Sequence, residues 1–450
     1  MARRHNKRAA TQGTKSSKSA RAESAAQCQA TAGPSQRVTI HDLPPELIDQ
    51  VCVYLDRDLM ASLRLASKAL SLYATHNYYS QVLEMQIVDL TGFSLYHLAA
   101  IAEDESMAPH VKSLFVAPEM FRRYGLLRPP ELWTFDENSG DLLLPQFFSD
   151  ALQEIVCHLP NCKALHFLQT PAQQSDAGYI RRPTIADALA IILPAAVEAN
   201  MRPTEFFFIS NEQSQRDLHA LSHLDPLLPS PQCAALWSRL ESLCLHFDNL
   251  LEEIPPTDLA LHILPHVPRL QALELTFDRR MRSEQPAASA SRILNAILGD
   301  HSLAFRLEFL ALGNAFALDG GALREFLVHH APTLRDLSLS GLHLTRGSWT
   351  PIFEVLGAPK AFPHLESICL DRLSQSGSEC RHVCFCDVLQ DRIVDEETRA
   401  EIESSVVDSW QAEHLYECVE YQGSKMGVAL GKIARGATLA EAHEVHFVVG

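Results

Sequence analysis

A six-residue motif with apolar side chains at its first, fourth and sixth positions recurs along most of this 450-residue chain. Its copies begin at Val111, Cys162, Thr204, Leu240, Leu270, Leu307, Leu334 and Leu365, and Val82 begins a candidate opening copy. The fourth and sixth positions follow the two-residue period of a strand, and helix-like segments lie between the copies. The sequence therefore predicts a strand followed by a helix, repeated many times.

This repetition is typical of a leucine-rich-repeat solenoid, whose common form has a period of about 20–29 residues. Here successive copies start 51, 42, 36, 30, 37, 27 and 31 residues apart. The copies from Leu240 onward are regular, whereas the number of true repeats before Leu240 stays open. The alternative is a conventional α/β domain with a parallel sheet, but its strands are almost continuously apolar. Glu274, Asp336 and Ser338 interrupt the strands of this chain, so we favour an α/β solenoid over residues 81–373.

The two ends of the chain differ from the repeats. Residues 1–37 hold eight Lys and Arg against one acid, so they carry +7 and the remainder carries −24. A segment so poor in large apolar residues cannot offset its ordering entropy, and we expect a disordered basic tail. A nuclear-import signal at residues 3–8 and a mitochondrial transit peptide are the alternatives. Residues 374–450 break the pattern and are expected to cap the array.

Residues 38–80 predict three short helices. Pro44 and Pro45 suit a first helical turn, where the missing N–H has no intrahelical partner. Asp58 and Ser67 are the predicted N-caps of the second and third helices. About 40 residues make too small a core to be stable alone, so the module is expected to lean on a neighbour or a partner.

The string Leu43-Pro44-Pro45-Glu46-Leu47-Ile48, followed by Val51, Leu55-Asp56, Asp58-Leu59 and Leu63-Arg64-Leu65-Ala66-Ser67-Lys68, resembles the F-box motif. Together with the long, irregular repeats, the arrangement is similar to fungal F-box proteins with leucine-rich repeats. Ala66 stands where the family often has Val, and Leu70 where it often has an aromatic residue, and both reduce the apolar surface offered to a partner.

The resemblance implies that the module docks on a Skp-type adaptor, which joins it to a cullin–RING ubiquitin ligase while the repeats bind a protein substrate. The residues implied at or near the adaptor interface are Leu43, Pro44, Leu47, Ile48, Val51, Leu63 and Lys68. The core of the module is the alternative place for the same residues. We expect Pro44 and Ile48 at the interface and Leu55 and Leu59 in the core.

The residues between the apolar motif positions point to the concave face of such an array. Candidate substrate-binding residues on that face are His246, Glu274, Asp336 and Asp371. The carboxylates favour a basic or donor-rich protein segment as the ligand, and an ordinary solvated sheet face is the alternative.

Composition and motifs argue against other classes. A net charge of −17 disfavours broad nucleic-acid binding, and no apolar run reaches the roughly 18 residues of a membrane helix. Eleven scattered cysteines suggest a reduced compartment, cytoplasmic or nuclear. We expect no cofactor, no metal and no catalytic activity, because Gly427–Lys432 lacks the spacing of a phosphate loop and Cys380–Cys386 lacks a second pair of metal ligands. The predicted function is a ubiquitin-ligase substrate adaptor, and the alternative is a leucine-rich-repeat interaction scaffold without that role.

Overall fold

The computed structural model describes residues 39–117, 134–135, 142–143, 146–168, 184–210, 224, 226–247, 259–277, 288–300, 303–376, 381–385, 418–423 and 426–441. The expected basic tail at residues 1–37 lies outside the described residues, as do Cys380 and Cys386.

Three α-helices occupy the segment that resembles an F-box, after a 3₁₀ turn at Ile40–Asp42. They are α1 (Pro45–Val53), α2 (Arg57–Ala66) and α3 (Lys68–Val82). Ser67 caps α3, since its hydroxyl accepts the N–H of Leu70 at 3.2 Å. Asp56, rather than the predicted Asp58, caps α2 by accepting the N–H of Leu59 at 2.8 Å. The helices enclose a small core of their own, made of Ile48, Cys52, Met60, Leu70 and Ala74.

A ten-stranded sheet follows, and its strands stand in the order in which they occur along the chain. The strands are β1 (Met85–Val88), β2 (Ser113–Val116), β5 (Ala164–Leu168), β6 (Glu205–Ser210), β7 (Ser242–Phe247), β8 (Ala272–Phe277), β9 (Phe309–Gly313), β11 (Asp336–Ser340), β13 (Ser367–Asp371) and β16 (Cys418–Gln422). Every pairing is parallel except the last, in which β16 runs antiparallel to β13. The fold is therefore mixed α/β with a large parallel sheet.

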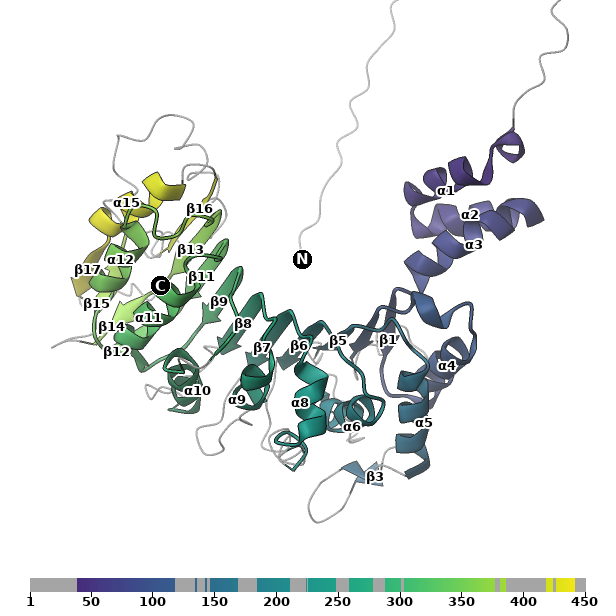
Figure 1. Cartoon of the computed structure of the whole chain (residues 1–450), viewed down its shortest axis with the longest axis horizontal. Coiled ribbons are helices and arrows are strands. Elements are labelled where there is room, and N and C mark those ends of the chain that lie inside the picture. Colours follow the sequence, from purple (N-terminus) through teal and green to yellow (C-terminus); the bar gives the residue numbers. More distant parts are fainter. Residues whose placement is uncertain are drawn as a thin grey trace, which may run out of the picture.

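Helices cover the outer side of this sheet, which follows a curve with the strands lining its inside (Figure 1). They are α4 (Gly92–Glu103), α5 (Gln146–Cys157), α6 (Ile185–Glu198), α8 (Pro231–Trp237), α9 (Leu259–Ile263), α10 (Ala288–Leu298), α11 (Gly320–His330), α12 (Thr350–Gly357) and α15 (Met426–Gly436). Short 3₁₀ turns lie at Ala108–His110 and Leu264–His266. Among the helices of the described ranges, none combines the length and the apolar character that crossing a bilayer requires.

A second, five-stranded sheet lies beside the C-terminal part of the array. It contains β10 (Leu318–Asp319), β12 (His343–Arg346), β14 (Ser374–Gln375), β15 (Arg381–Cys384) and β17 (Thr438–Glu441), and a separate hairpin pairs β3 (Thr134–Phe135) with β4 (Leu142–Leu143). The chain leaves β9, β11 and β13 through one left-handed residue each, at Asn314, Gly341 and Arg372, with φ of 55°, 62° and 48°. Asn and Gly tolerate this conformation, whereas Arg372 adopts it at a cost.

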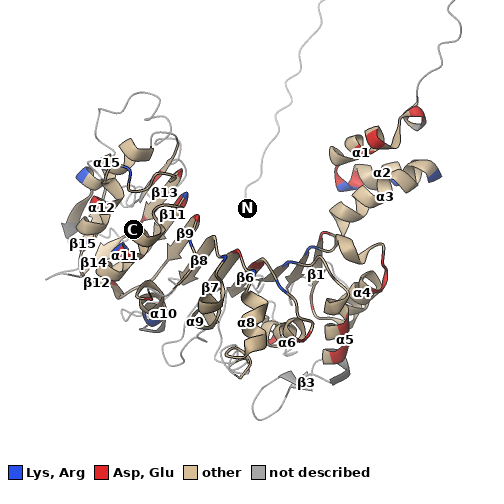
Figure 2. Cartoon of the chain, in the orientation of Figure 1, with Lys and Arg blue, Asp and Glu red and all other residues tan. Residues whose placement is uncertain are grey.

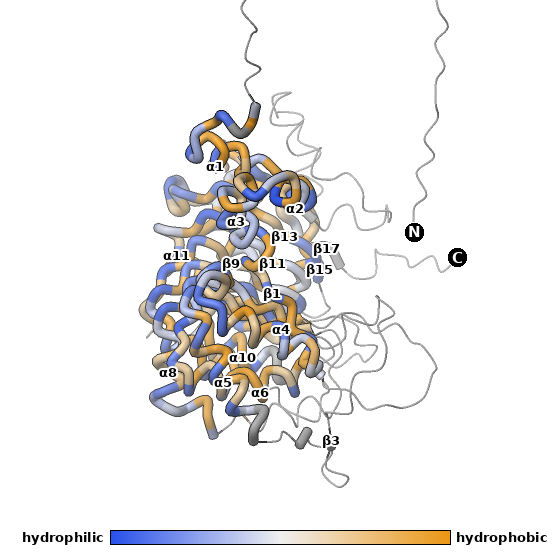
Figure 3. Tube along the Cα trace, turned by 90° about the vertical axis from the view of Figure 1, so that its right-hand side faces the viewer, coloured by the Kyte–Doolittle hydropathy of each residue, from blue (hydrophilic) through white to orange (hydrophobic). Residues whose placement is uncertain are grey.

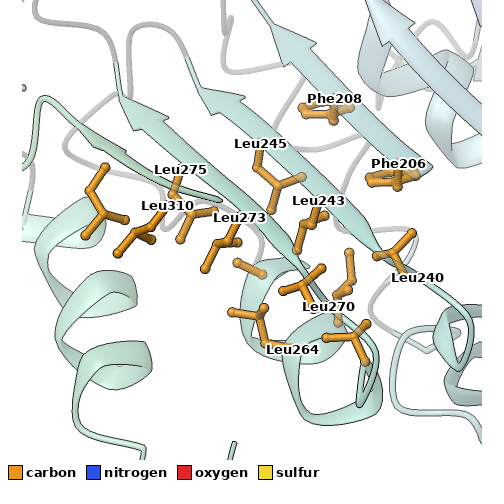
Figure 4. Close-up of a cluster of buried hydrophobic side chains, with 14 of the residues drawn as sticks. Phe206, Phe208, Leu240, Leu243, Leu245, Leu264, Leu270, Leu273, Leu275 and Leu310 are labelled. Carbon is orange, nitrogen blue, oxygen red and sulfur yellow. The ribbon is translucent and has the colours of Figure 1, made fainter. Parts of the chain in front are cut away.

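The apolar motif residues form the core between the sheet and the helices. Leu240, Leu243 and Leu245 of one copy are buried, as are Leu270 and its equivalents in the next (Figure 4). Full burial of one such side chain stabilises a fold by about 1.5–3 kcal/mol, and each copy repeats the contribution. The side view shows hydrophobic and hydrophilic stretches alternating along the chain, as expected for elements that bury one face (Figure 3).

In two copies of the motif the structure places the buried residues one position away from the predicted register. In β6 the buried side chains are Phe206 and Phe208, which pair with Leu243 and Leu245, so the copy begins at Pro203 rather than Thr204. In β1 the buried residues are Gln86 and Val88, so the opening copy begins one residue after Val82. A shift of one residue moves every side chain to the other face of a strand. Because residues 206–209 are all apolar, their pattern could not show which face is buried.

Candidate protein-binding surfaces

The helical module exposes an unusual amount of apolar surface. Large apolar side chains that are exposed in the described part number thirteen, and eight of these lie between residues 47 and 73. The eight are Leu47, Val51, Val53, Tyr54, Leu59, Leu65, Leu72 and Tyr73. Exposed apolar surface concentrated in this way is typical of interaction sites, so the module is a candidate protein-binding surface.

Helix α1 and the two residues after it carry two apolar stripes, an inner one and an outer one. Ile48, Cys52 and Leu55 are spaced four and three residues apart and face the module core. Leu47, Val51 and Tyr54 have the same spacing one position earlier and face solvent, with Tyr54 88% exposed. Residues four and three apart share a helix face, which explains both stripes.

The predicted adaptor residues fall into three groups. Pro44, Leu47, Val51 and Lys68 are exposed, while Leu43 and Leu63 are partly buried against the module core. Ile48 is 0% exposed, so its interpretation as an interface residue is corrected: it belongs to the core of the module.

The core expectations need one correction as well. Leu55 packs on the module core as expected, but Leu59 is 54% exposed. Successive residues of an α-helix are about 100° apart, so the face that buries Met60 leaves the preceding Leu59 outside the core. Sequence reasoning missed Tyr54, Leu65 and Leu72 as surface residues. The signal that was available is the number of apolar residues, which is larger than so small a core can hold.

The module is joined closely to the sheet. Only two residues separate the end of helix α3 from the start of β1, and the Gln86 side chain donates to the carbonyls of Val82 and Leu83 at 3.3 and 3.1 Å. The Ser80 hydroxyl lies 2.9 Å from Nδ1 of His110, which precedes β2. Burial, with a smaller contribution from His76, lowers the pKa of His110, so the imidazole is neutral in this contact. These contacts hold the module at one end of the array (Figure 1).

The second candidate surface is the inner face of the ten-stranded sheet, opposite the helices. The strands pair in register, so equivalent inner-face positions form rows across the sheet. The middle row consists of Ile87, Phe115, His166, Phe207, Cys244, Glu274, Ala311, Ser338, Cys369 and Glu420. It changes from apolar and aromatic to small and acidic along the array.

His166 lies at the centre of the aromatic part. Its ring centroid is 5.8 Å from that of Phe115 and 4.5 Å from that of Phe207. Its Nε2 lies 3.6 Å from a carboxylate oxygen of Glu205, too far for a good hydrogen bond. Burial lowers the pKa of His166 more than Glu205 raises it, so the row is uncharged here near neutral pH.

The four predicted substrate-binding residues all lie half-buried on the inner face, but the structure does not bring them into one pocket. His246 pairs with Thr276 in the neighbouring strand, and Glu274 lies one strand before β9 while Asp336 lies one strand after it. Such a separation of two strand spacings is about 10 Å. The predicted residues therefore form a dispersed surface.

The carboxylates differ in how well they are compensated. Asp371 accepts from Nε of Arg372 and from the Ser340 hydroxyl, both at 2.8 Å, so its charge is already paired. Burial and the nearby Glu366 raise the pKa of Asp336, while Arg335 opposes the shift. Glu274 contacts Cys244, whose pKa burial and Glu274 together raise to about 12.

Charged side chains also alternate along one edge of the sheet. Arg335 lies 3.4 Å from the Glu308 carboxylate and 3.2 Å from that of Glu366, and Lys112 pairs with Glu84 at 2.9 Å. Figure 2 shows acidic and basic positions side by side near β9, β11 and β13. All are substantially exposed, so each pair contributes little to stability.

Two sequence segments that were considered for phosphate or metal binding lie in a helix and in a strand. Residues Gly427–Lys432 lie within helix α15, so they do not form the loop that cradles a phosphate. His382 and Cys384 lie on β15. Within the described ranges, no three His, Cys, Asp or Glu side chains are placed to hold a metal ion.

No family model matches the chain, and no curated protein matches it.

Proposed function

We propose that this chain is the substrate-recognition subunit of a Skp–cullin–F-box ubiquitin ligase. The helical module docks on the Skp-type adaptor, and the strand–helix units form a leucine-rich-repeat solenoid whose inner face binds a protein substrate. The observation that carries the proposal is the concentration of exposed apolar side chains on a three-helix module that resembles an F-box. The role needs no cofactor and no catalytic residue in this chain, and it is compatible with the cytoplasm or the nucleus.

The outer stripe of α1 is the part of the module best suited to docking. Leu47, Val51 and Tyr54 lie on one helix face, and Pro44 lies immediately before the same helix. Burial of apolar surface at a partner contributes about 25 cal/mol per Å², so these side chains would be a natural centre of an interface. Leu70 is buried in the module core, so its departure from the family pattern affects that core rather than the docking surface.

The geometry also suits a substrate receptor. The module is held by direct contacts at the first strands, and the inner face extends away from it across ten strands. A rigid connection would present a bound substrate at a defined distance from the ligase, and proximity of this kind promotes transfer.

A scaffold without a ligase role is the second candidate. The observation that favours it is Ala66, which is exposed where the family often has the larger Val. In that case the exposed surface of the module would bind another partner.

Substitution of the outer stripe tests the proposal in the full-length chain. We expect Leu47→Asp with Val51→Asp to abolish capture of a purified Skp-type adaptor, because the carboxylates would be buried without partners in the complex. Stability should change little, since both residues are exposed in the free chain. The matched control is Val328→Asp on α11, an exposed valine outside the module. Unchanged adaptor capture by the double variant would refute the outer stripe as the docking surface. No capture by the wild-type chain would refute the ligase role and favour the scaffold.

A further inference from the structure

The inner face of the sheet is divided into two chemical parts along the array. On β1, β2, β5 and β6, the middle-row residues are apolar or aromatic, and Leu168 and Ile209 extend this part in the next row. From β7 onward the middle row carries small side chains and the carboxylates of Glu274 and Glu420. Asp336 and Asp371 lie in the rows on either side. The division follows strand order, so the two parts lie at opposite ends of one surface.

The first part forms a continuous aromatic surface. The rings of Phe115, His166 and Phe207 are in contact across three neighbouring strands, and all three are half-buried. Two strand spacings give this surface a width of about 10 Å, which suits one large aliphatic or aromatic side chain. We call these three residues the aromatic row.

Among the described residues, the carboxylates of the second part are compensated unequally. Arg372 pairs with Asp371, whereas Arg335 pairs with Glu308 and Glu366 and offsets the effects of burial and of Glu366 on Asp336 only in part. Ala311, which pairs with Glu274, and Ser338, two residues after Asp336 on β11, are small and leave room for a long side chain to approach. An incoming Lys or Arg would therefore gain attraction from a surface that carries negative charge.

Building on the proposed function, we infer that the substrate is a protein segment with two recognition elements. An aliphatic or aromatic anchor lies on the aromatic row, and Lys or Arg residues lie over Glu274 and Asp336. From β5 to β8 and β11 there are three and five strand spacings, or about 14 and 24 Å. An extended chain covers about 3.3 Å per residue, so the anchor and the cations are separated by about four to seven residues.

The two elements have different physical roles. The anchor supplies affinity through burial of apolar surface, which salt hardly weakens, whereas the cations supply attraction that salt screens. A segment with both elements at the right spacing gains from both at once, because the second contact is made within one molecule. A nucleic acid does not fit, since its phosphates would be repelled by the carboxylates.

Synthetic peptides test the inference by fluorescence anisotropy on the full-length chain. The matched peptide carries a Trp anchor, a three-residue Gly/Ser spacer and a Lys-Arg-Lys block, so its cations lie about four to six residues from the anchor. A second peptide has the reverse order. Control peptides lack the anchor, lack the cations, or place the two elements next to each other. We expect the better of the two orders to bind at least about tenfold more tightly than any control, a difference of about 1.4 kcal/mol.

Matched protein variants assign the two elements. We expect Phe207→Ser to abolish the tighter binding that the Trp anchor gives the peptide. Phe309→Ser, on the same face but outside the aromatic row, should leave that tighter binding intact. Glu274→Lys with Asp336→Lys should remove the benefit of the cations and the salt dependence. The control Glu103→Lys with Glu354→Lys changes the net charge by the same amount, but on the outer helices. It should keep both the tighter binding that the cations give and its salt dependence. Thermal melting and Phe207→Leu, which keeps an apolar side chain, separate a loss of binding from a loss of folding.

The outcomes distinguish this inference from the proposed function. Equal binding of matched and control peptides, tighter binding of a peptide with a Glu block, or no measurable binding would overturn the two-element substrate. The same experiments include capture of the Skp-type adaptor, which the inner-face variants should retain. Loss of peptide selectivity with intact adaptor capture counts against the substrate class alone, whereas a wild-type chain that captures no adaptor counts against the ligase role.

Discussion

The helical module and the sheet array follow the same rule of burying apolar side chains, but with different results. The array combines nine parallel strands and a layer of helices around one continuous core. The module encloses five fully buried residues and leaves more large apolar side chains exposed than it buries. The fraction of surface that a chain buries rises with its size. The comparison shows that apolar residues in a small module are more available for partners than the same residues in a long array.

The largest expected effect separates the two cores. Ile48→Asp and Leu273→Asp each place a carboxylate at a position that is 0% exposed, and burial of an unpaired charge costs several kcal/mol. We expect Ile48→Asp to unfold the module while the array stays folded, and Leu273→Asp to destabilise the array. Hydrogen exchange followed by mass spectrometry measures both. Loss of protection throughout the array in the Ile48 variant would show that the two cores are coupled.

Acid should weaken the array before the module. Burial lowers the pKa of His330, which is 0% exposed, to about 3, and His166 and His343 shift in the same direction. The unfolded chain takes up these protons near pH 6.5 and the folded chain does not. The contribution of these neutral histidines to the free energy of unfolding is therefore fully present above about pH 6.5. It is lost on acidification toward pH 3, by about 1.4 kcal/mol per pH unit for His330.

Melting temperature as a function of pH measures this loss. His330→Phe keeps the packing against Phe305 and Phe326 but cannot be protonated, so its melting temperature should fall less steeply between pH 6.5 and 4. Its stability at pH 7 should be lower, because the Leu307 N–H loses its acceptor. Parallel curves for the variant and the wild type would contradict a neutral, buried His330.

The smallest effect concerns the corner where β11 leaves the sheet. Gly341 has a φ of 62°, and a Cβ at this position would lie 2.4 Å from Oδ1 of Asn314. Gly341→Ala should therefore destabilise the array by about 1–3 kcal/mol. Gly427→Ala in α15 is the matched control, since a Cβ added there would have no atom within 4 Å and Ala favours a helix. Chemical denaturation measures both, and equal effects would show that the corner is not strained.

Local residue patterns determined much of this protein. The three helices of the module, the cap at Ser67 and the motif copies from Leu240 onward follow from short-range spacing, because the residues that form each element are close in sequence. The buried Leu273 and Leu275 could be assigned from alternation alone, since polar residues lie between and after them.

Where apolar residues do not alternate with polar ones, only the tertiary structure decided which face of a strand or helix is buried. The register of residues 206–209 depends on pairing with β7, because four consecutive apolar residues give either face an equal gain from burial. In the same way, contacts between helices placed Ile48 inside the module and Leu59 outside it. The state of Asp371 depends on Arg372 and on Ser340 from another strand, and the division of the inner face into two parts depends on the alignment of ten strands. These properties arise from neighbours that are distant in sequence, so no single segment contains them.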